Sequence, residues 1–474
     1  MTENSRTPKK EESPTDTAKT DWQSLKLADK YLPKIKTASE LEPAILLRDV
    51  HNQINKEIAI NGWVYNIRSS GKIMFLLMRD GSGEIQAVAS ANEVGAEVWQ
   101  QLQELTNESS LQVKGIVKKE PRSPSGFELQ LSSVKLIQIA PEYPLGKKEH
   151  GPDFLLDNRH LWLRSKKQRA VMELRNEIFF SMTLFLKEQD FIRFDTPIFQ
   201  PVSCEDTSEL FAINYFGKKS YLSQSGQLYC EAAEFALGRT YDFGPVFRAE
   251  KSKTRKHLIE FWMLDAELPF TDLNGLMDFE ETMIKRVISD CLKNKSRALK
   301  ILERDTSKLE RYTKESFIKI KHQEVINLLN DKFGSKLSDL DDIGAPEEAQ
   351  LASIYDLPVF VTDWPAEIKA FYMPQYHDGK IFRAICADLI APEGFGEIIG
   401  GGEREFNYNK LLKVLEQKKY PYKDYAWYMD LRKYGTIPHS GFGIGIERLI
   451  RFISGVQHIR ETIPFPRMLN RLYP

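Results

Sequence analysis

Residues 246–267, VFRAEKSKTRKHLIEFWMLDAE, hold a run of cations that could bind a polyphosphate. These cations stand between two runs of residues typical of β-strands: Arg248, Lys251, Lys253, Arg255, Lys256 and His257. Guanidinium and ammonium groups bind phosphate oxygens strongly, so we expect a hairpin whose loop faces a polyphosphate. A solvated surface loop is the alternative, because most charged side chains lie in water.

A second stretch, HSGFGIGIERLIRFISG (439–455), alternates glycines on a predicted strand and then begins a helix with Glu447 and Arg448. Glycines at alternate strand positions let another group approach the backbone closely. The stretch does not match the dinucleotide-binding pattern, because the third glycine and a preceding βαβ unit are missing. The sequence therefore predicts a strand against which another group lies.

A third stretch, SQSGQLYCEA (223–232), has the composition of a ligand pocket that contains amide groups and a carboxylate but no lysine or arginine. A ligand carboxylate buried there would lack a cationic partner, at a cost of several kcal/mol. The pattern therefore favours a polar, uncharged ligand group. Taken alone, Cys230 and Glu231 could equally be a buried helix position and an ordinary surface acid.

The elements that position these residues fall into two groups. From about 56 to 140 the pattern is three strands, a helix and two strands, which is typical of the five-stranded OB barrel that binds single-stranded nucleic acid. A small barrel used only for packing is the alternative. Beyond it, apolar residues recur at helical spacing in 168–189, a strand and a proline follow in 191–201, and strand-like segments return in 357–402 and 441–446.

These patterns predict several domains, as the length of 474 residues also suggests. We expect a disordered tail and approach segment (1–40), an OB-fold domain (41–140), a hinge (141–167) and a catalytic domain (168–474) with a helical insert (268–345). The net charge of -1 gives no support to nucleic-acid binding, so any basic surface must be local. Four scattered cysteines, no apolar leader and no apolar run of membrane-spanning length predict a cytoplasmic protein without a membrane partner.

Three of these motifs resemble those of class II aminoacyl-tRNA synthetases. Arg248-x-Glu250 with Phe261 is similar to their motif 2, GFGIGIERL to motif 3, and FIRFDTPIFQP to motif 1. With a barrel in front, they resemble subclass IIb, the aspartyl, asparaginyl and lysyl enzymes, from about residue 45 to the end of the chain. The resemblance implies an α+β architecture: an N-terminal OB-fold β-barrel and a catalytic antiparallel sheet flanked by helices.

The resemblance also implies an ATP site with Arg248, Glu250 and Arg448 as catalytic residues. Arg248 would hold the α-phosphate, Arg448 the γ-phosphate, and Phe261 would stack on adenine. Arg255 and His257 would contact phosphates or the tRNA acceptor end. Two acids, Asp388 and Glu397, would hold Mg²⁺, with Glu397 also at the ATP. These acids stand slightly further apart than in aspartyl enzymes, which resembles the asparaginyl group.

In the family's amino-acid pocket, aspartyl enzymes carry a lysine where this chain has Cys230. An asparagine amide could donate to Glu231 and accept from Arg404, while Glu205 would receive the α-ammonium group and Gln227 would hold the backbone end. Further stretches, such as WPAEIKAFYM and FGEIIGGGERE, resemble asparaginyl enzymes of the bacterial type. The expected reaction is therefore the activation of L-asparagine with ATP and its transfer to tRNA(Asn).

Three alternatives stay open at the level of sequence. An aspartyl-tRNA synthetase is opposed by the missing lysine, and an ammonia-dependent asparagine synthetase on the same fold is opposed by the barrel. A non-catalytic relative is opposed by the intact Arg248 and Arg448.

Two further expectations come from the resemblance. In the barrel, Phe75 and Gln86 would read the central anticodon base, and Arg68 would join a neighbouring base. The segment 169–197 would form the interface of a homodimer, although a monomer core would show the same apolar pattern.

Overall fold

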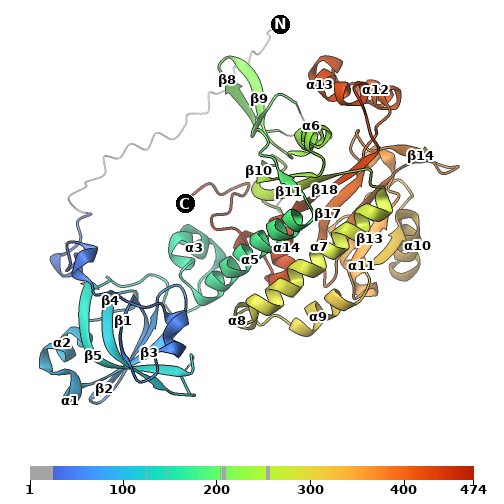
Figure 1. Ribbon diagram of the computed structural model, residues 1–474. Helices are drawn as coiled ribbons and strands as arrows, with labels where there is room; N and C mark the ends of the chain where they lie inside the picture. Colours follow the sequence, from blue (N-terminus) through green and yellow to red (C-terminus); the bar gives the residue numbers. More distant parts are fainter. Residues whose placement is uncertain (1–24, 124, 147, 203, 205–209, 252–256) are drawn as a thin grey trace, which may run out of the picture. The chain divides into compact units, whose positions relative to one another are not determined.

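A computed structural model describes residues 25–123, 125–146, 148–202, 204, 210–251 and 257–474. The chain forms two compact units, Met1–Glu149 and His150–Pro474, and each is described by itself (Figure 1). No helix in the described part of the chain is long and apolar enough to cross a membrane.

The first unit is a five-stranded closed barrel, as predicted, with the strand order β1-β2-β3-β5-β4. Its elements are β1 (Glu57–Ser70), β2 (Ile73–Arg79), β3 (Glu84–Ser90), α1 (Ala91–Val94), α2 (Ala96–Gln103), β4 (Ser110–Lys119) and β5 (Phe127–Gln138). Alternate residues such as Ile60, Leu76 and Val113 are fully buried inside it. The parallel pairing of β3 with β5 completes the closed barrel.

The second unit is built on an eight-stranded sheet of order β12-β13-β16-β17-β18-β11-β10-β6. Its strands are β6 (Ile192–Arg193), β10 (Thr240–Phe247), β11 (Glu260–Pro269), β12 (Ile318–Lys321), β13 (Val359–Thr362), β16 (Cys386–Ala391), β17 (Gly396–Glu403) and β18 (His439–Gly445). The strands from β13 to β10 run antiparallel, and the two edge strands pair in parallel. The mixed α+β architecture expected from the sequence is confirmed.

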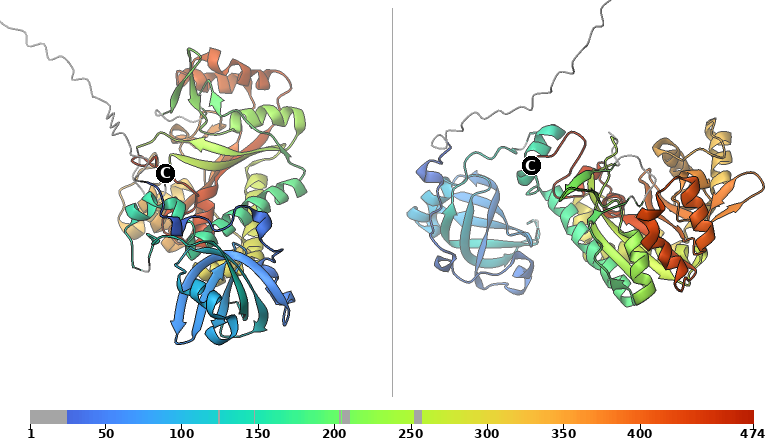
Figure 2. Two further views of the ribbon diagram at one scale, coloured as in Figure 1. Left: turned by 90° about the vertical axis from the view of Figure 1, so that its left-hand side faces the viewer. Right: turned by 90° about the horizontal axis from the view of Figure 1, so that it is seen from above.

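One face of this sheet is covered by α5 (Lys166–Glu188), α7 (Leu273–Asn294) and α14 (Ile446–Ser454). Figures 1 and 2 show α5 and α7 side by side. The predicted apolar stripe of α5 is buried in this core, and the side chain of Ser165 caps the helix by accepting from the Gln168 N–H. From β11, Leu264 and Ala266 enter the same core.

The other face of the sheet carries the site, because strand side chains alternate between faces. On β11, Met263, Asp265 and Glu267 alternate with these core residues, so they face away from α5 and α7. The elements near this face are β7 (Phe199–Gln200), β8 (Ala212–Tyr215), β9 (Lys218–Leu222), α6 (Gln227–Leu237), β14 (Gln375–His377), β15 (Phe382–Ala384), α12 (Tyr408–Gln417) and α13 (Tyr422–Lys433). A second apolar core, around Trp364 and Tyr428, lies on this side.

Two predicted segments contain more structure than the sequence suggested. Part of the predicted hinge (141–167) forms the short helices α3 (Pro152–Asp157) and α4 (Arg159–Trp162) of the second unit. The predicted helical insert (268–345) includes the strand β12 and the whole core helix α7, besides α8 (Ser296–Ile301), α9 (Thr306–Lys314) and α10 (His322–Phe333); α11 (Ala345–Ile354) begins at its end. The helix α7 is integral because its apolar face packs on the main sheet.

Candidate active site

The structure brings five of the residues predicted to bind ATP, and the predicted catalytic residue Glu250, into one pocket. Its lining includes Arg248, Glu250, His257, Phe261, Glu397 and Arg448. The remaining predicted ATP ligand, Arg255, lies outside the described residues. A pocket with arginines at its wall and an aromatic ring beside them suits a nucleotide, because the ring offers a stacking surface and the arginines bind phosphate.

The hairpin β10–β11 positions the first arginine. The backbone N–H of Arg248 donates to the Ile259 carbonyl at 2.9 Å, so the ladder continues one residue beyond β10. The guanidinium carbon of Arg248 lies 5.5 Å from the centre of the Phe261 ring on β11. Pairing and ring contact together hold this arginine over the aromatic wall of the pocket.

The second arginine comes from the first turn of α14. Arg448 Nη1 lies 3.1 Å from Glu397 Oε2 and donates to the Glu397 carbonyl, also at 3.1 Å. The preceding Glu447 is buried and anchors the helix start: it accepts from Arg175 Nη1 at 2.6 Å and from the Trp262 N–H at 2.9 Å. Glu447 thus fixes where Arg448 projects.

The alternating glycines of β18 explain the close approach predicted for this strand. A Cβ added at Gly441 would lie 2.2 Å from the Glu267 carboxylate, and one at Gly443 would lie 3.0 Å from Asp265 Oδ1. Only glycine leaves room for these acids from the neighbouring strand. The group that approaches β18 is therefore a pair of acidic side chains from β11.

The two predicted metal ligands, Asp388 on β16 and Glu397 on β17, border one space. A Cβ at Gly400 would lie 3.5 Å from Glu397 Oε1 and 3.6 Å from Asp388 Oδ1. The Lys369 ammonium group forms an ion pair with Asp388. Burial raises the pKa of Asp388 to about 6, and repulsion from Glu397 adds to this rise. The attraction of Lys369 acts in the opposite direction but is weaker than burial.

Glu397 itself is held ionised. Its burial opposes ionisation, but the cations Arg448, Lys369 and Arg248 outweigh it and lower the pKa of Glu397. Among the described residues no group of three or more His, Cys, Asp and Glu side chains is arranged to hold a metal. These two carboxylates would therefore supply only part of a magnesium shell, which phosphate oxygens and water commonly complete.

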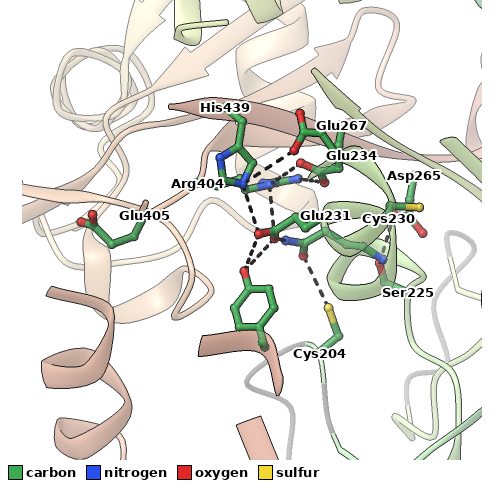
Figure 3. A network of polar contacts seen from close by, with 12 residues as sticks. Cys204, Ser225, Cys230, Glu231, Glu234, Asp265, Glu267, Arg404, Glu405 and His439 are labelled. Carbon is green, nitrogen blue, oxygen red and sulfur yellow. Dashed lines mark hydrogen bonds and ion pairs between the residues drawn. The ribbon is translucent and has the colours of Figure 1, made fainter. Parts of the chain in front are cut away.

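The predicted amino-acid residues Gln227, Glu231 and Arg404 also meet, in a buried polar cluster (Figure 3). Glu205 lies outside the described residues. The carboxylate of Glu231 accepts from Gln227 Nε2 at 2.6 Å, from Arg432 Nη2 at 2.6 Å and from the Tyr428 hydroxyl at 2.7 Å. The side-chain amide of Gln227 thus already donates to Glu231. The sequence predicted this contact for the amide of the bound asparagine instead.

Arg404, predicted to donate to the ligand carbonyl, is engaged as well. Its Nε and Nη2 donate to the two carboxylate oxygens of Glu267 at 3.0 and 2.7 Å. Burial disfavours the charged form of Glu231, yet Arg432, His439 and Arg404 together lower its pKa well below the ordinary range. The cluster is a network of paired charges and differs from the isolated pair of ligand contacts that the sequence predicted.

Sequence reasoning missed several members of these sites. Lys369, Glu267 and His439 come from separate segments, while Tyr428 and Arg432 lie one turn apart on α13. The i, i+4 spacing of Tyr428 and Arg432 was the available signal, since such residues share one face of a helix. Nothing local marked that face as buried against α6.

The three predicted anticodon residues share one face of the barrel. Arg68 pairs with Phe75 across β1 and β2, and Gln86 pairs with Leu77, two residues from Phe75 on the same face. Arg68 is exposed, and Phe75 and Gln86 are half-buried. Gln86 Nε2 donates to Glu128 Oε2 at 3.1 Å, so Glu128 is a fourth residue of this surface.

Comparison with known proteins agrees with this geometry. Residues 151–469 match the family described as tRNA synthetases class II (D, K and N), and residues 58–137 match the OB-fold nucleic acid binding domain. The fold is thus that of a class II tRNA synthetase.

Individual relatives narrow the family. The chain is 46% identical over 444 residues to the asparagine--tRNA ligase of Streptococcus mutans, covering 91% of this chain and 99% of that protein. The structure of asparaginyl-tRNA synthetase from Pyrococcus horikoshii, complexed with asparaginyl-adenylate, matches with a TM-score of 0.88 and 38% identity over 92% of this chain and 100% of that one. That from Entamoeba histolytica matches with a TM-score of 0.82 and 29% identity, over 91% of this chain and 100% of that one. The chain belongs to the asparagine--tRNA ligase family.

Proposed function

We propose that this protein activates L-asparagine with ATP and transfers it to the 3′ end of tRNA(Asn). The carrying observation is that β11 and β18 join the two subsites along one face. Phe261 and Met263 of β11 line the nucleotide pocket, and Glu267 of the same strand holds Arg404 in the polar cluster. A nucleotide and an amino acid bound there would lie end to end.

In the first step the α-carboxylate of asparagine attacks the α-phosphorus of ATP. The new C–O–P bond forms as the bond to the β-phosphate breaks and pyrophosphate leaves. Both reactants are anionic, so Arg248 and Arg448 spread positive charge along the phosphates and hold them in line. In the second step a ribose hydroxyl at the tRNA terminus attacks the carbonyl carbon, and AMP leaves.

Mg²⁺ is proposed at Asp388 and Glu397, because both carboxylates border the space beside Gly400. When bound, the ion would neutralise phosphate charge. Lys369 orients Asp388 toward that space by ion pairing.

Selection of asparagine is assigned to the cluster around Glu231. Gln227 Nε2 donates to Glu231 Oε1. The side-chain amide of asparagine can take the place of the Gln227 amide in this hydrogen bond, because both are primary amides. Arg404 is proposed to offer its remaining N–H groups to the side-chain carbonyl. Glu205 is proposed to hold the α-ammonium group.

On the barrel, Phe75 is proposed to stack on an anticodon base while Gln86 reads its edge and Arg68 contacts a neighbour. A homodimer is proposed through the segment 169–197, where Phe180 of α5 and Ile192 of β6 are 68% and 45% exposed. Phe180→Glu should shift the sedimentation of the protein toward the monomer. We also propose a cytoplasmic location, since Cys204, Cys230, Cys291 and Cys386 are buried free thiols.

The deciding experiment is amino-acid-dependent ATP–pyrophosphate exchange, with asparagine and aspartate assayed in parallel. Exchange with asparagine alone supports the proposal, and charging of tRNA(Asn) then tests the second step. Exchange with aspartate at a comparable rate would make this an aspartyl or relaxed enzyme. The absence of pyrophosphate exchange with both amino acids would contradict an activating role.

A further inference from the structure

The ammonium group of Lys369 lies beside the two carboxylates proposed to hold Mg²⁺, so a lysine and a metal ion would compete there. Nζ of Lys369 forms an ion pair with Asp388 Oδ2, and the two side chains are 17% and 10% exposed. The other oxygen, Oδ1, lies 3.6 Å from a Cβ added at Gly400, and Glu397 Oε1 lies 3.5 Å from the same point. One oxygen of Asp388 therefore binds the lysine, while the other borders the space proposed for the ion.

Packing holds Lys369 in this place. Its Nζ lies 4.0 Å from the centre of the Trp364 ring, which is buried and donates from Nε1 to the Val361 carbonyl at 2.8 Å. At the backbone, the Lys369 carbonyl accepts from Lys418 Nζ at 3.1 Å. A lysine side chain is flexible in water, so contacts at both of its ends make this ammonium group a fixed positive charge.

The charge of Lys369 acts on both acids. It attracts Asp388 and Glu397, whereas Arg248 and Arg448 act on Glu397. Magnesium in proteins commonly binds one or two carboxylates together with phosphate oxygens of the substrate. A divalent ion that arrives without phosphates would meet carboxylates already paired with fixed cations, and repulsion from Lys369 would oppose its binding.

We propose that Lys369 is a resident counter-cation that keeps divalent ions away from Asp388 and Glu397 until ATP supplies phosphate oxygens. The metal then enters with the nucleotide rather than before it. When the phosphates bind, they neutralise Arg248 and Arg448 and add the oxygen ligands that the two carboxylates do not supply. This inference deepens the proposed magnesium site and rests on the proposed function.

The test measures Mn²⁺ binding to the nucleotide-free protein through the loss of the electron paramagnetic resonance signal of free Mn²⁺. Mn²⁺ is a suitable probe because it prefers the same carboxylate and water ligands as Mg²⁺. Wild type is compared with Lys369→Met, which keeps an unbranched side chain without charge, and with Lys369→Gln, which can still donate to Asp388. Two neutral variants are used so that one should fold even if the other does not.

Three further variants serve as controls. Lys285→Met is the matched one, because Lys285 pairs with Glu281, with side chains 23% and 14% exposed, and its Nζ lies 5.4 Å from the centre of the Phe317 ring. Lys369→Arg keeps the positive charge. The double variant Lys369→Met/Glu397→Gln removes one of the two carboxylates and so tests where the ion binds.

We expect the Kd for Mn²⁺ to fall at least tenfold in the neutral Lys369 variants and to stay near the wild-type value in the three controls. An unchanged Kd in the folded neutral variants overturns the inference, and so does an equal gain in any of the controls. The titration needs neither amino acid nor tRNA. Wild-type protein without pyrophosphate exchange would therefore overturn the proposed function separately from this result.

Discussion

The nucleotide pocket and the amino-acid cluster lie on the same strands but treat charge in opposite ways. In the pocket, Arg448 and Glu397 have side chains that are 27% and 38% exposed, and the cations Arg248 and Arg448 share one carboxylate. In the cluster, Arg404 and Glu231 are 3% and 0% exposed, and each arginine has its own acid. A polyphosphate requires surplus positive charge, whereas a neutral amide requires balanced charge.

Breaking a pair in the cluster should have the largest effect on stability. Arg432→Met leaves Glu231 buried without its main counter-ion, and we expect the free energy of unfolding to fall by about 3–5 kcal/mol. Denaturant titration measures this loss. The double variant Glu231→Gln/Arg432→Met should recover much of it, because no buried charge is left unpaired; a double variant as unstable as the single one would contradict the charge argument.

Removing a cation from the nucleotide pocket should instead affect catalysis. Arg448→Ala should lower the rate of pyrophosphate exchange by about 100- to 1000-fold, as expected for the loss of a group that stabilises transition-state charge. Stability should change little, since the side chain is partly exposed. The control is Arg311→Ala, a surface arginine paired with Glu315; equal losses of exchange in both variants would refute a specific role for Arg448.

The barrel allows the two chemical steps to be separated. Phe75→Ala should weaken productive tRNA binding by about 1–3 kcal/mol, the usual contribution of one stacked base. It should leave pyrophosphate exchange unchanged, because that step needs no tRNA. Phe127→Ala, which changes another half-buried aromatic residue of the barrel, serves as the control. Equal charging by wild type and Phe75→Ala would remove Phe75 from the anticodon surface.

The smallest expected effect concerns Glu280 on α7. Burial, with the charge of Asp388, raises the pKa of Glu280 well above its ordinary value. The folded state therefore keeps a proton that the unfolded chain releases above its ordinary pKa, so this group loses stability as pH rises. Glu280→Gln does not titrate, and its gain over wild type should grow by at most about 1.4 kcal/mol per pH unit. Thermal unfolding at pH 6 and at pH 7, one unit apart, measures the difference, and an equal gain at both would contradict the shift.

Local patterns were sufficient for the barrel and for α5. Alternating apolar residues and turn glycines specify strands, and the apolar positions Val171, Leu174 and Ile178 specify one helix face. The meeting of Arg248, Phe261 and Arg448 in one pocket was also predictable, since all three lie in or beside motifs with a family resemblance. The role of α7 in the core was not predictable, because a charged outer face hides the apolar stripe that the sheet covers.

The sequence by itself determined which residues could bind phosphate, that Cys230 stands where a lysine would favour aspartate, and that a barrel precedes the catalytic domain. Only the tertiary structure decided how the cluster is balanced. Glu231, Glu267 and Arg432 are separated by many residues in the chain, and they meet because α6, β11 and α13 pack together. The proposed selection of a neutral side chain rests on paired charges in one buried space, and that pairing depends on packing between distant segments.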